Sequence, residues 1–151
     1  MRYHRFERGL IFVAAAGLTF AWGCTPQPEL PETLSGAWDV QQIAGASLGE
    51  DVRIRVEIDA ERGVITGFTG CNDFSAPMDG FSGAIAIGEV QEVDAACPSI
   101  AAATDETRFL GVLRSIGRYS RHGRSLELLP RESGEALLRL RYADVQDGDA
   151  E

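Results

Sequence analysis

Apolar and polar residues alternate along much of the chain. From 52 to 59, four aliphatic residues alternate with four charged ones, the pattern of a strand with one buried and one solvent-facing side. Residues 60–63 predict a hairpin loop, and 64–69 predict the returning strand. The same pattern predicts further strands over 37–43, 84–90, 126–128 and 136–142. We therefore expect a sheet of antiparallel strands.

One segment has helical spacing instead. Between 99 and 118, apolar residues such as Phe109 and Ile116 recur every three or four positions. Two acidic residues precede Arg114 and Arg118 along it, the order that the helix dipole favours. We predict an α+β fold, in which one amphipathic helix covers a curved or barrel-like antiparallel sheet. The aromatic residues expected in its core are Trp38, Phe68, Phe74, Phe81 and Phe109.

The length and charge narrow the functional classes. The 151 residues suit one domain with short attachments, and 44% hydrophobic with 25% charged residues is an ordinary globular composition. All 14 basic residues are arginine, so no lysine is present to form a Schiff base or bind a nucleotide phosphate. The net charge of −9 disfavours nucleic acid as a partner.

The first 23 residues have the features of a secretory signal peptide. Three arginines precede an uncharged run over 9–23, which spans about 22 Å as a helix and is shorter than a bilayer core. The run ends at Cys24, and Ala-Trp-Gly-Cys over 21–24 is similar to the lipobox of bacterial lipoproteins, whose cysteine is lipidated. We predict a signal peptide over 1–23 and lipidation of Cys24. A plain secretory signal and an uncleaved anchor are the alternatives.

The segments on either side of the domain are predicted from composition. Residues 24–33 are proline-rich and predict a short tether, and the acidic residues 144–151 predict a disordered tail. The folded domain is expected over 34–143. A lipid on Cys24 would anchor it permanently, so we expect it in a bacterial cell envelope, at the outer membrane and facing the periplasm.

Two short motifs carry a resemblance to a known family. Gly70, Cys71 and Asn72 follow a predicted strand, and Cys97 follows two alanines just before the predicted helix. With these motifs, the range 34–142 resembles the META domain family of HslJ-like heat-inducible envelope lipoproteins. The resemblance implies a non-enzymatic protein without a cofactor, linked to stress tolerance and antibiotic resistance.

Within this resemblance, the two cysteines are candidates for a disulfide. An oxidising envelope favours one, and Cys71 and Cys97 form an even pair once Cys24 is assigned to lipid. By loop entropy, such a bridge would contribute roughly 3.5 kcal/mol. The alternative is two free, buried thiols that pack as small apolar groups. Gly70 and Asn72 suit a sharp bend, because both tolerate positive φ.

Other polar residues are candidates for catalysis, for metal binding and for binding of an anionic group. Cys71 would be a nucleophile if His122 acted as its base, but a hairpin turn explains this histidine equally well. Asn72, Asp73 and Asp79 follow no calcium-loop spacing, so solvated carboxylates are the preferred interpretation and no metal site is predicted. A basic run remains, which fits an anionic headgroup, an acidic partner or a solvated helix end: Arg114, Arg118, Arg121 and Arg124.

These observations favour a monomeric interaction or chaperone-like module. Its expected partners are the membrane, through the lipid anchor, and an envelope protein. The alternative is a carrier that holds a lipid or another apolar ligand inside a barrel, and a cysteine-dependent enzyme ranks last.

Overall fold

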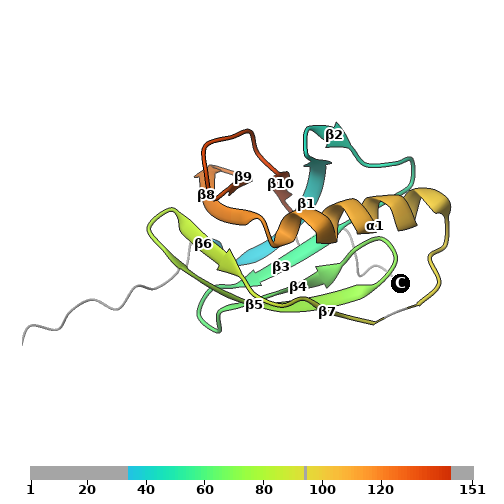
Figure 1. Ribbon diagram of the computed structural model, residues 1–151, viewed down its shortest axis with the longest axis horizontal. Helices are drawn as coiled ribbons and strands as arrows, with labels where there is room; N and C mark the ends of the chain where they lie inside the picture. The colour runs from blue at the N-terminus through green and yellow to red at the C-terminus, as the bar shows by residue number, and fades with distance from the viewer. Residues whose placement is uncertain (1–33, 94, 144–151) are drawn as a thin grey trace, which may run out of the picture.

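Eight antiparallel strands close into a barrel in the computed structural model, which describes residues 34–93 and 95–143 (Figure 1). The strands follow one another around the barrel in the order β1-β3-β4-β5-β6-β8-β9-β10, and β10 pairs with β1 to close it. Two short strands lie outside this ring, with β2 paired to β1 and β7 paired to β5. The elements are β1 (Gly36–Ile43), β2 (Ala46–Ser47), β3 (Arg55–Asp59), β4 (Val64–Phe68), β5 (Asp73–Phe81), β6 (Ala84–Ile87), β7 (Gln91–Glu92), α1 (Ile100–Leu113), β8 (Ile116–His122), β9 (Ser125–Pro130) and β10 (Leu138–Tyr142).

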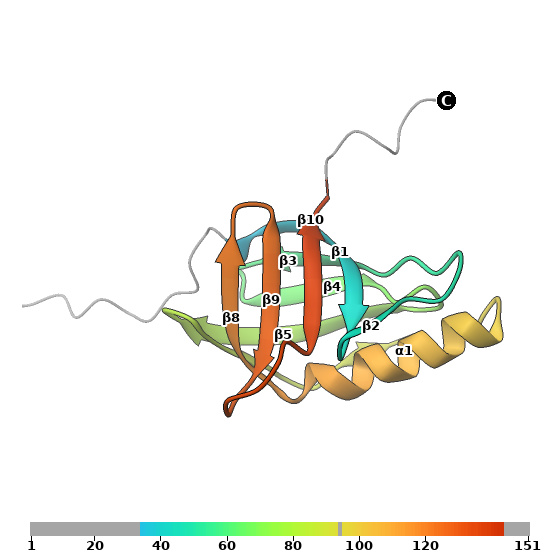
Figure 2. The same cartoon turned by 90° about the horizontal axis from the view of Figure 1, so that it is seen from above.

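The barrel is flattened into two layers whose strands cross. Seen from above, β8, β9 and β10 run across the direction of β3, β4 and β5 (Figure 2). Strand β1 belongs to both layers, because Gly36 to Asp39 pair with β3 and Trp38 to Ile43 pair with β10. Its register with β10 shifts between Val40 and Gln42. Such a bulge bends a strand and lets it pass from one layer to the other.

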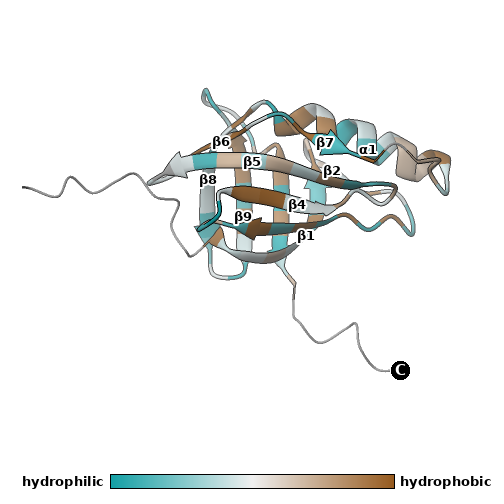
Figure 3. Ribbon diagram, turned by 90° about the horizontal axis from the view of Figure 1, so that it is seen from below, coloured by the Kyte–Doolittle hydropathy of each residue, from teal (hydrophilic) through white to brown (hydrophobic). Residues whose placement is uncertain are grey.

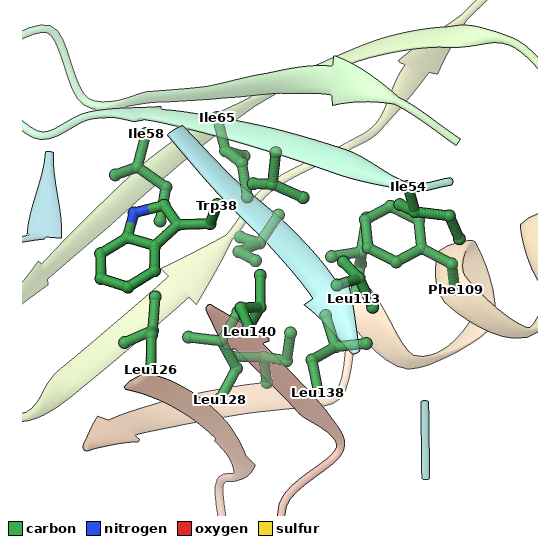
Figure 4. Close-up of a cluster of buried hydrophobic side chains, with 14 of the residues drawn as sticks. Trp38, Ile54, Ile58, Ile65, Phe109, Leu113, Leu126, Leu128, Leu138 and Leu140 are labelled. Atoms are coloured by element: carbon green, nitrogen blue, oxygen red, sulfur yellow. The ribbon is translucent and has the colours of Figure 1, made fainter. Parts of the chain in front are cut away.

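The inward side chains of both layers form one core. Along β3, β9 and β10 buried and more exposed positions alternate, as the sequence pattern predicted, and apolar and polar residues alternate along the strands in Figure 3. Trp38 and Phe109 lie at opposite ends of the cluster, with leucines of β9 and β10 between them (Figure 4). Both aromatic side chains are fully buried.

Helix α1 packs on the barrel through a narrow face. Ser99 caps its first turn, since its side chain accepts a hydrogen bond of 3.1 Å from the backbone N–H of Ala102. The buried positions follow the helical period, and Phe109 meets Phe74 of β5 edge to face, with 5.2 Å between the ring centroids. The expected antiparallel, barrel-like sheet with one helix is thus confirmed. In the described part of the chain, no helix is both long and apolar enough to cross a membrane.

Two segments differ from the sequence expectations. The helix ends at Leu113, not at 118, and 116–122 forms β8 because it pairs with β9 along its length. Residues 73–81, for which the alternation predicts no strand, form β5. Local spacing missed both strands because pairing with distant segments stabilises them.

The predicted core aromatics are partly correct. Trp38, Phe74 and Phe109 are buried, but Phe68 is 43% exposed, because alternation along β4 turns it to the same outer side as Thr66. The structure does not describe the side chain of Phe81. The predicted signal peptide 1–23, tether 24–33 and tail 144–151 also lie outside the described residues.

Replacing Phe109 with alanine tests the packing of the helix. Phe109→Ala is expected to lower the free energy of unfolding by about 3–5 kcal/mol, because it leaves a cavity between α1 and β5. Ile100→Ala, in the same helix but at a side chain 87% exposed, should change it by less than about 0.5 kcal/mol. Urea unfolding followed by circular dichroism measures both, and similar values for the two variants would contradict this packing.

Candidate functional site

A tight turn joins β4 to β5 and carries the Gly-Cys-Asn motif. Gly70 has a φ of +90°, and a Cβ there would lie 2.9 Å from Val52, so the turn requires glycine. The Thr69 hydroxyl oxygen accepts hydrogen bonds from the backbone N–H groups of Asn72 at 2.8 Å and Cys71 at 3.3 Å. The Thr69 backbone N–H donates to the Asn72 carbonyl at 2.9 Å. The turn therefore closes on itself and holds Cys71 at its tip.

A disulfide links this turn to the loop that precedes α1. Cys71 and Cys97 are bonded, with an S–S distance of 2.05 Å and 4.8 Å between their Cα atoms. Both residues are half-buried, and because they are bonded to each other, the alternative of two free, buried thiols does not describe this structure. The bridge joins residues 26 positions apart and fixes the start of the helix against the barrel.

Glu106 of α1 lies against the disulfide. Its Oε1 accepts hydrogen bonds from the Thr69 hydroxyl at 2.6 Å and from Nδ2 of Asn72 at 3.0 Å. Its Oε2 lies 3.4 Å from Sγ of Cys97, a sulfur that carries no proton in the disulfide. Asn72 also accepts a bond of 2.9 Å from the N–H of Ala95. Asn72 thus connects the turn, the loop and the helix, and the buried Asn72 and Thr69 are both fully engaged.

A second polar contact attaches the helix further along. Asp105 is 3% exposed and accepts hydrogen bonds from the Gly49 N–H at 2.6 Å and from Arg108 at 2.7 Å. Arg108 also donates to the Ile43 carbonyl at 2.8 Å. The predicted match of charge to the helix dipole is therefore wrong, since the first turn holds no acidic residue and the last turn no basic one. The acidic pair of α1 attaches the helix to neighbouring segments instead.

Thr69, Asp105 and Glu106 were missed as site residues. The signal was present for Asp105, because it occupies the same helical face as the buried Phe109. A carboxylate on an apolar face requires a polar partner from elsewhere in the fold. The partners of Glu106 come from the β4–β5 turn, and no local pattern near 106 identifies them.

The residues considered for catalysis and for calcium binding have other positions or partners in the structure. Cys71 is bonded to Cys97, while His122 lies in the β8–β9 hairpin with its Nε2 3.0 Å from the Ser120 hydroxyl. Asp73 and Asp79 are exposed positions of β5, in agreement with solvated carboxylates, and Asn72 is buried.

Among residues 34–93 and 95–143, one group has ligand atoms close enough together to hold a metal ion. Those of Cys71, Cys97 and Glu106 all lie within 4.8 Å of one another. The sulfurs of a disulfide are not thiolates, however, so the group as it stands lacks the ligands that a soft cation requires.

The basic run has no helical arrangement. Arg114 follows α1, Arg118 and Arg121 belong to β8, and Arg124 lies in the turn between β8 and β9. The expectation of a helix end complementing the dipole is therefore wrong. The guanidinium of Arg121 lies 5.1 Å from the centre of the Trp38 ring, where it covers the buried end of the core.

An exposed apolar side chain and a hollow lie on the outer surface of the layer that contains β3, β4 and β5. The exposed Phe68 stands between Arg55 of β3 and Asp73 of β5 in the strand register. Asp73 accepts a backbone hydrogen bond from Val93, which is 65% exposed. A hollow of about 570 Å³ lies beside Phe68, lined by β1 residues and by 53–55. This surface combines apolar contact area with charges of both signs.

Reduction tests the contribution of the disulfide. A reducing agent is expected to lower the free energy of unfolding of the wild-type chain by about 3.5 kcal/mol, the loop-entropy value for this separation. The double variant Cys71→Ala/Cys97→Ala should have lower stability and show no response to the reductant. Chemical unfolding with and without dithiothreitol measures the difference. Equal stability of the reduced and oxidised wild-type chain would contradict a stabilising bridge.

The comparisons with known proteins agree with this geometry. A model of the META domain matches residues 32–144, and no curated protein matches the chain. An NMR structure of a protein from Burkholderia xenovorans is similar in fold, with 18% identity and a TM-score of 0.59 over 80% of this chain and 93% of that one. A second NMR structure has 16% identity and a TM-score of 0.60 over 78% of this chain and 98% of its own. Since the family model spans the whole described barrel, the chain belongs to the META domain family.

Proposed function

We propose that this META domain is a non-catalytic module of a lipid-anchored envelope protein, and that it binds a protein partner on its outer surface during stress. The family and the barrel fold fit a non-enzymatic, envelope-type module. Within the family, we place the protein with the HslJ-like heat-inducible lipoproteins, which implies roles in stress tolerance and antibiotic resistance. Its anchor would be a lipid on Cys24 at the outer membrane, facing the periplasm.

The packed interior is the observation that carries the interaction role. Side chains from both layers and from α1 fill the space between the sheets, and the largest of them are less than 2% exposed. A carrier needs an internal cavity for its ligand, whereas these side chains are packed against one another. The hollow beside Phe68 lies on the outer surface, where a partner protein has access.

The polar cluster supports a role as a rigid scaffold. The disulfide, Asn72 and Glu106 attach the loop before α1 to the barrel at several points. A disulfide is durable in an oxidising compartment, which agrees with the envelope location. A surface held by such a scaffold binds a partner without first having to become ordered.

An apolar-ligand carrier is the second candidate. One feature favours it: β6 and β8 share a single residue pair, Ala84 with Arg118, together with a bond from the Tyr119 N–H to the Gly83 carbonyl. This is the shortest pairing in the barrel ring. Opening there would expose the core to a ligand.

Metabolic labelling tests the anchor. Palmitate is expected to label the wild-type protein and to leave Cys24→Ser unlabelled, because only that cysteine lies at the lipobox. Cys71→Ser is the matched control and should retain the label, since its cysteine lies within the folded domain. An unlabelled wild-type protein would remove the lipoprotein assignment.

Binding at the outer surface is tested in the envelope. Phe68→Asp is expected to weaken crosslinking of the protein to a discrete partner and to reduce survival of the cells under heat. The free energy of unfolding should change little, because Phe68 is 43% exposed. Ile100→Asp adds the same charge at another exposed apolar residue and should leave both readouts unchanged. Native mass spectrometry of gently extracted protein should show no bound apolar ligand. A retained ligand, together with unchanged crosslinking in Phe68→Asp, would favour the carrier instead.

A further inference from the structure

Charge is distributed unevenly along this acidic chain. Residues 114–143 contain seven arginines and three acidic residues, a net charge of +4. Residues 34–113 contain four arginines and thirteen acidic residues, a net charge of −9. The first range includes the whole of β8, β9 and β10, and the second includes β3, β4 and β5. The overall acidity therefore conceals one basic part of the molecule.

The fold places these two parts in different layers. Strands β8, β9 and β10 form one layer, and β3, β4 and β5 form the other (Figure 2). The outward positions of β8, β9 and β10 include Arg118, Arg139 and Arg141. The acidic residue at an outward position of these strands is Glu127. The outward charges of the second layer are mostly acidic: Glu57, Asp59, Asp73 and Asp79, with Arg55 among them. The molecule thus has a basic face and an acidic face.

The arginines of the basic face differ in their partners, which are backbone carbonyls for one of them and a carboxylate for another. Arg118 donates to the carbonyls of Pro130 and Glu132, at 3.0 and 2.7 Å, and these are neutral acceptors. Arg131 is exposed and its side chain lies over Gly117 of β8, where it leaves no room for a Cβ. Arg139 is paired with Glu127 at 3.0 Å, and about half of its side chain remains exposed.

The folded domain begins and ends beside this layer. The Leu34 carbonyl accepts a bond from Trp38 of β1, and the Ala143 N–H donates to the Ala37 carbonyl. Strand β1 pairs with β10 and so forms the side of the basic layer. Nine residues, 25–33, separate Cys24 from Leu34, the first described residue. Even fully extended, the ten residue steps from Cys24 to Leu34 span at most about 36 Å.

We propose that the outer face of β8, β9 and β10 docks on anionic lipid headgroups of the membrane that carries the anchor. The proposal rests on the lipid attachment at Cys24 argued above. A short tether keeps the domain at a high effective concentration near the surface, so a weak attraction is enough to orient it. The acidic face, which carries the exposed Phe68, then points into the aqueous compartment toward a protein partner.

Screening explains how an acidic protein can dock in this way. Charge attraction to a membrane falls off within a Debye length, about 8 Å at physiological ionic strength. Packed sheets lie about 10 Å apart, so the acidic face is separated from the membrane by more than this length. The arginines of the near face therefore contribute more than the overall charge does. Phosphate-bearing headgroups also match the guanidinium group geometrically.

Vesicle binding tests this docking without the anchor. The chain from residue 24 onward, carrying Cys24→Ser, is sedimented with vesicles of phosphatidylcholine, with and without phosphatidylglycerol, in about 0.1 M salt, where the Debye length is near 10 Å. We expect binding only to the anionic vesicles and its loss near 1 M salt. The triple variant Arg131→Gln/Arg139→Gln/Arg141→Gln should bind at least about tenfold more weakly.

A matched variant separates the face from the overall charge. Arg53→Gln/Arg55→Gln/Arg62→Gln removes the same three charges from the other part of the chain and should bind like the unsubstituted chain. Equal losses in both variants, or no binding to anionic vesicles at all, would overturn the proposal. Retention by an immobilised acidic protein in the absence of vesicle binding would assign the face to such a partner instead. Because this chain carries no lipid, its result is independent of palmitate labelling.

Discussion

The pairing of β1 with both β3 and β10 is the constraint on which the rest of this structure depends. It closes the barrel, so the inward side chains of eight strands meet in one core instead of lining an open sheet. Closure also removes the two edges that an open sheet would leave unpaired. The bulge in β1 makes this double pairing possible, because it bends the strand between two layers that cross.

Polar contacts, not only apolar ones, attach the helix to this barrel. Phe109 supplies an apolar contact, while Asp105 and Glu106 accept hydrogen bonds from two distant segments, at Gly49 and in the β4–β5 turn. A buried carboxylate lowers stability unless it is hydrogen-bonded, so these partners specify where the helix lies as well as stabilising it. The disulfide lies within the same polar cluster and holds the loop before α1 against the β4–β5 turn.

The two faces have different proposed functions, one in binding a protein partner and the other in binding the membrane. A partner surface around Phe68 and a membrane surface on β8, β9 and β10 are compatible because they belong to opposite layers. Both rest on a scaffold whose interior is filled. A filled barrel is less adaptable than a hollow one, and this favours binding by its outer surface over enclosure of a ligand.

The sequence by itself determined the strands that alternate cleanly, such as β3 and β10, and the presence of one amphipathic helix. These patterns are local and follow from which side of a strand or helix is buried. The same local information predicted that Trp38 and Phe109 belong to the core. It also predicted the positive φ of Gly70, a property of a single residue, whereas Asn72 does not have a positive φ and acts through its side chain.

Only the tertiary structure decided what depends on pairing between distant segments. Helical spacing carried the predicted helix through Ile116, but pairing with β9 made that residue the start of a strand. Register turned Phe68 outward, and folding brought Glu106 to the turn 34 residues earlier at Asn72. The separation of charge between two layers likewise arises when the strands are ordered in space. Each outcome depends on non-local contacts, whose partners local periodicity does not encode.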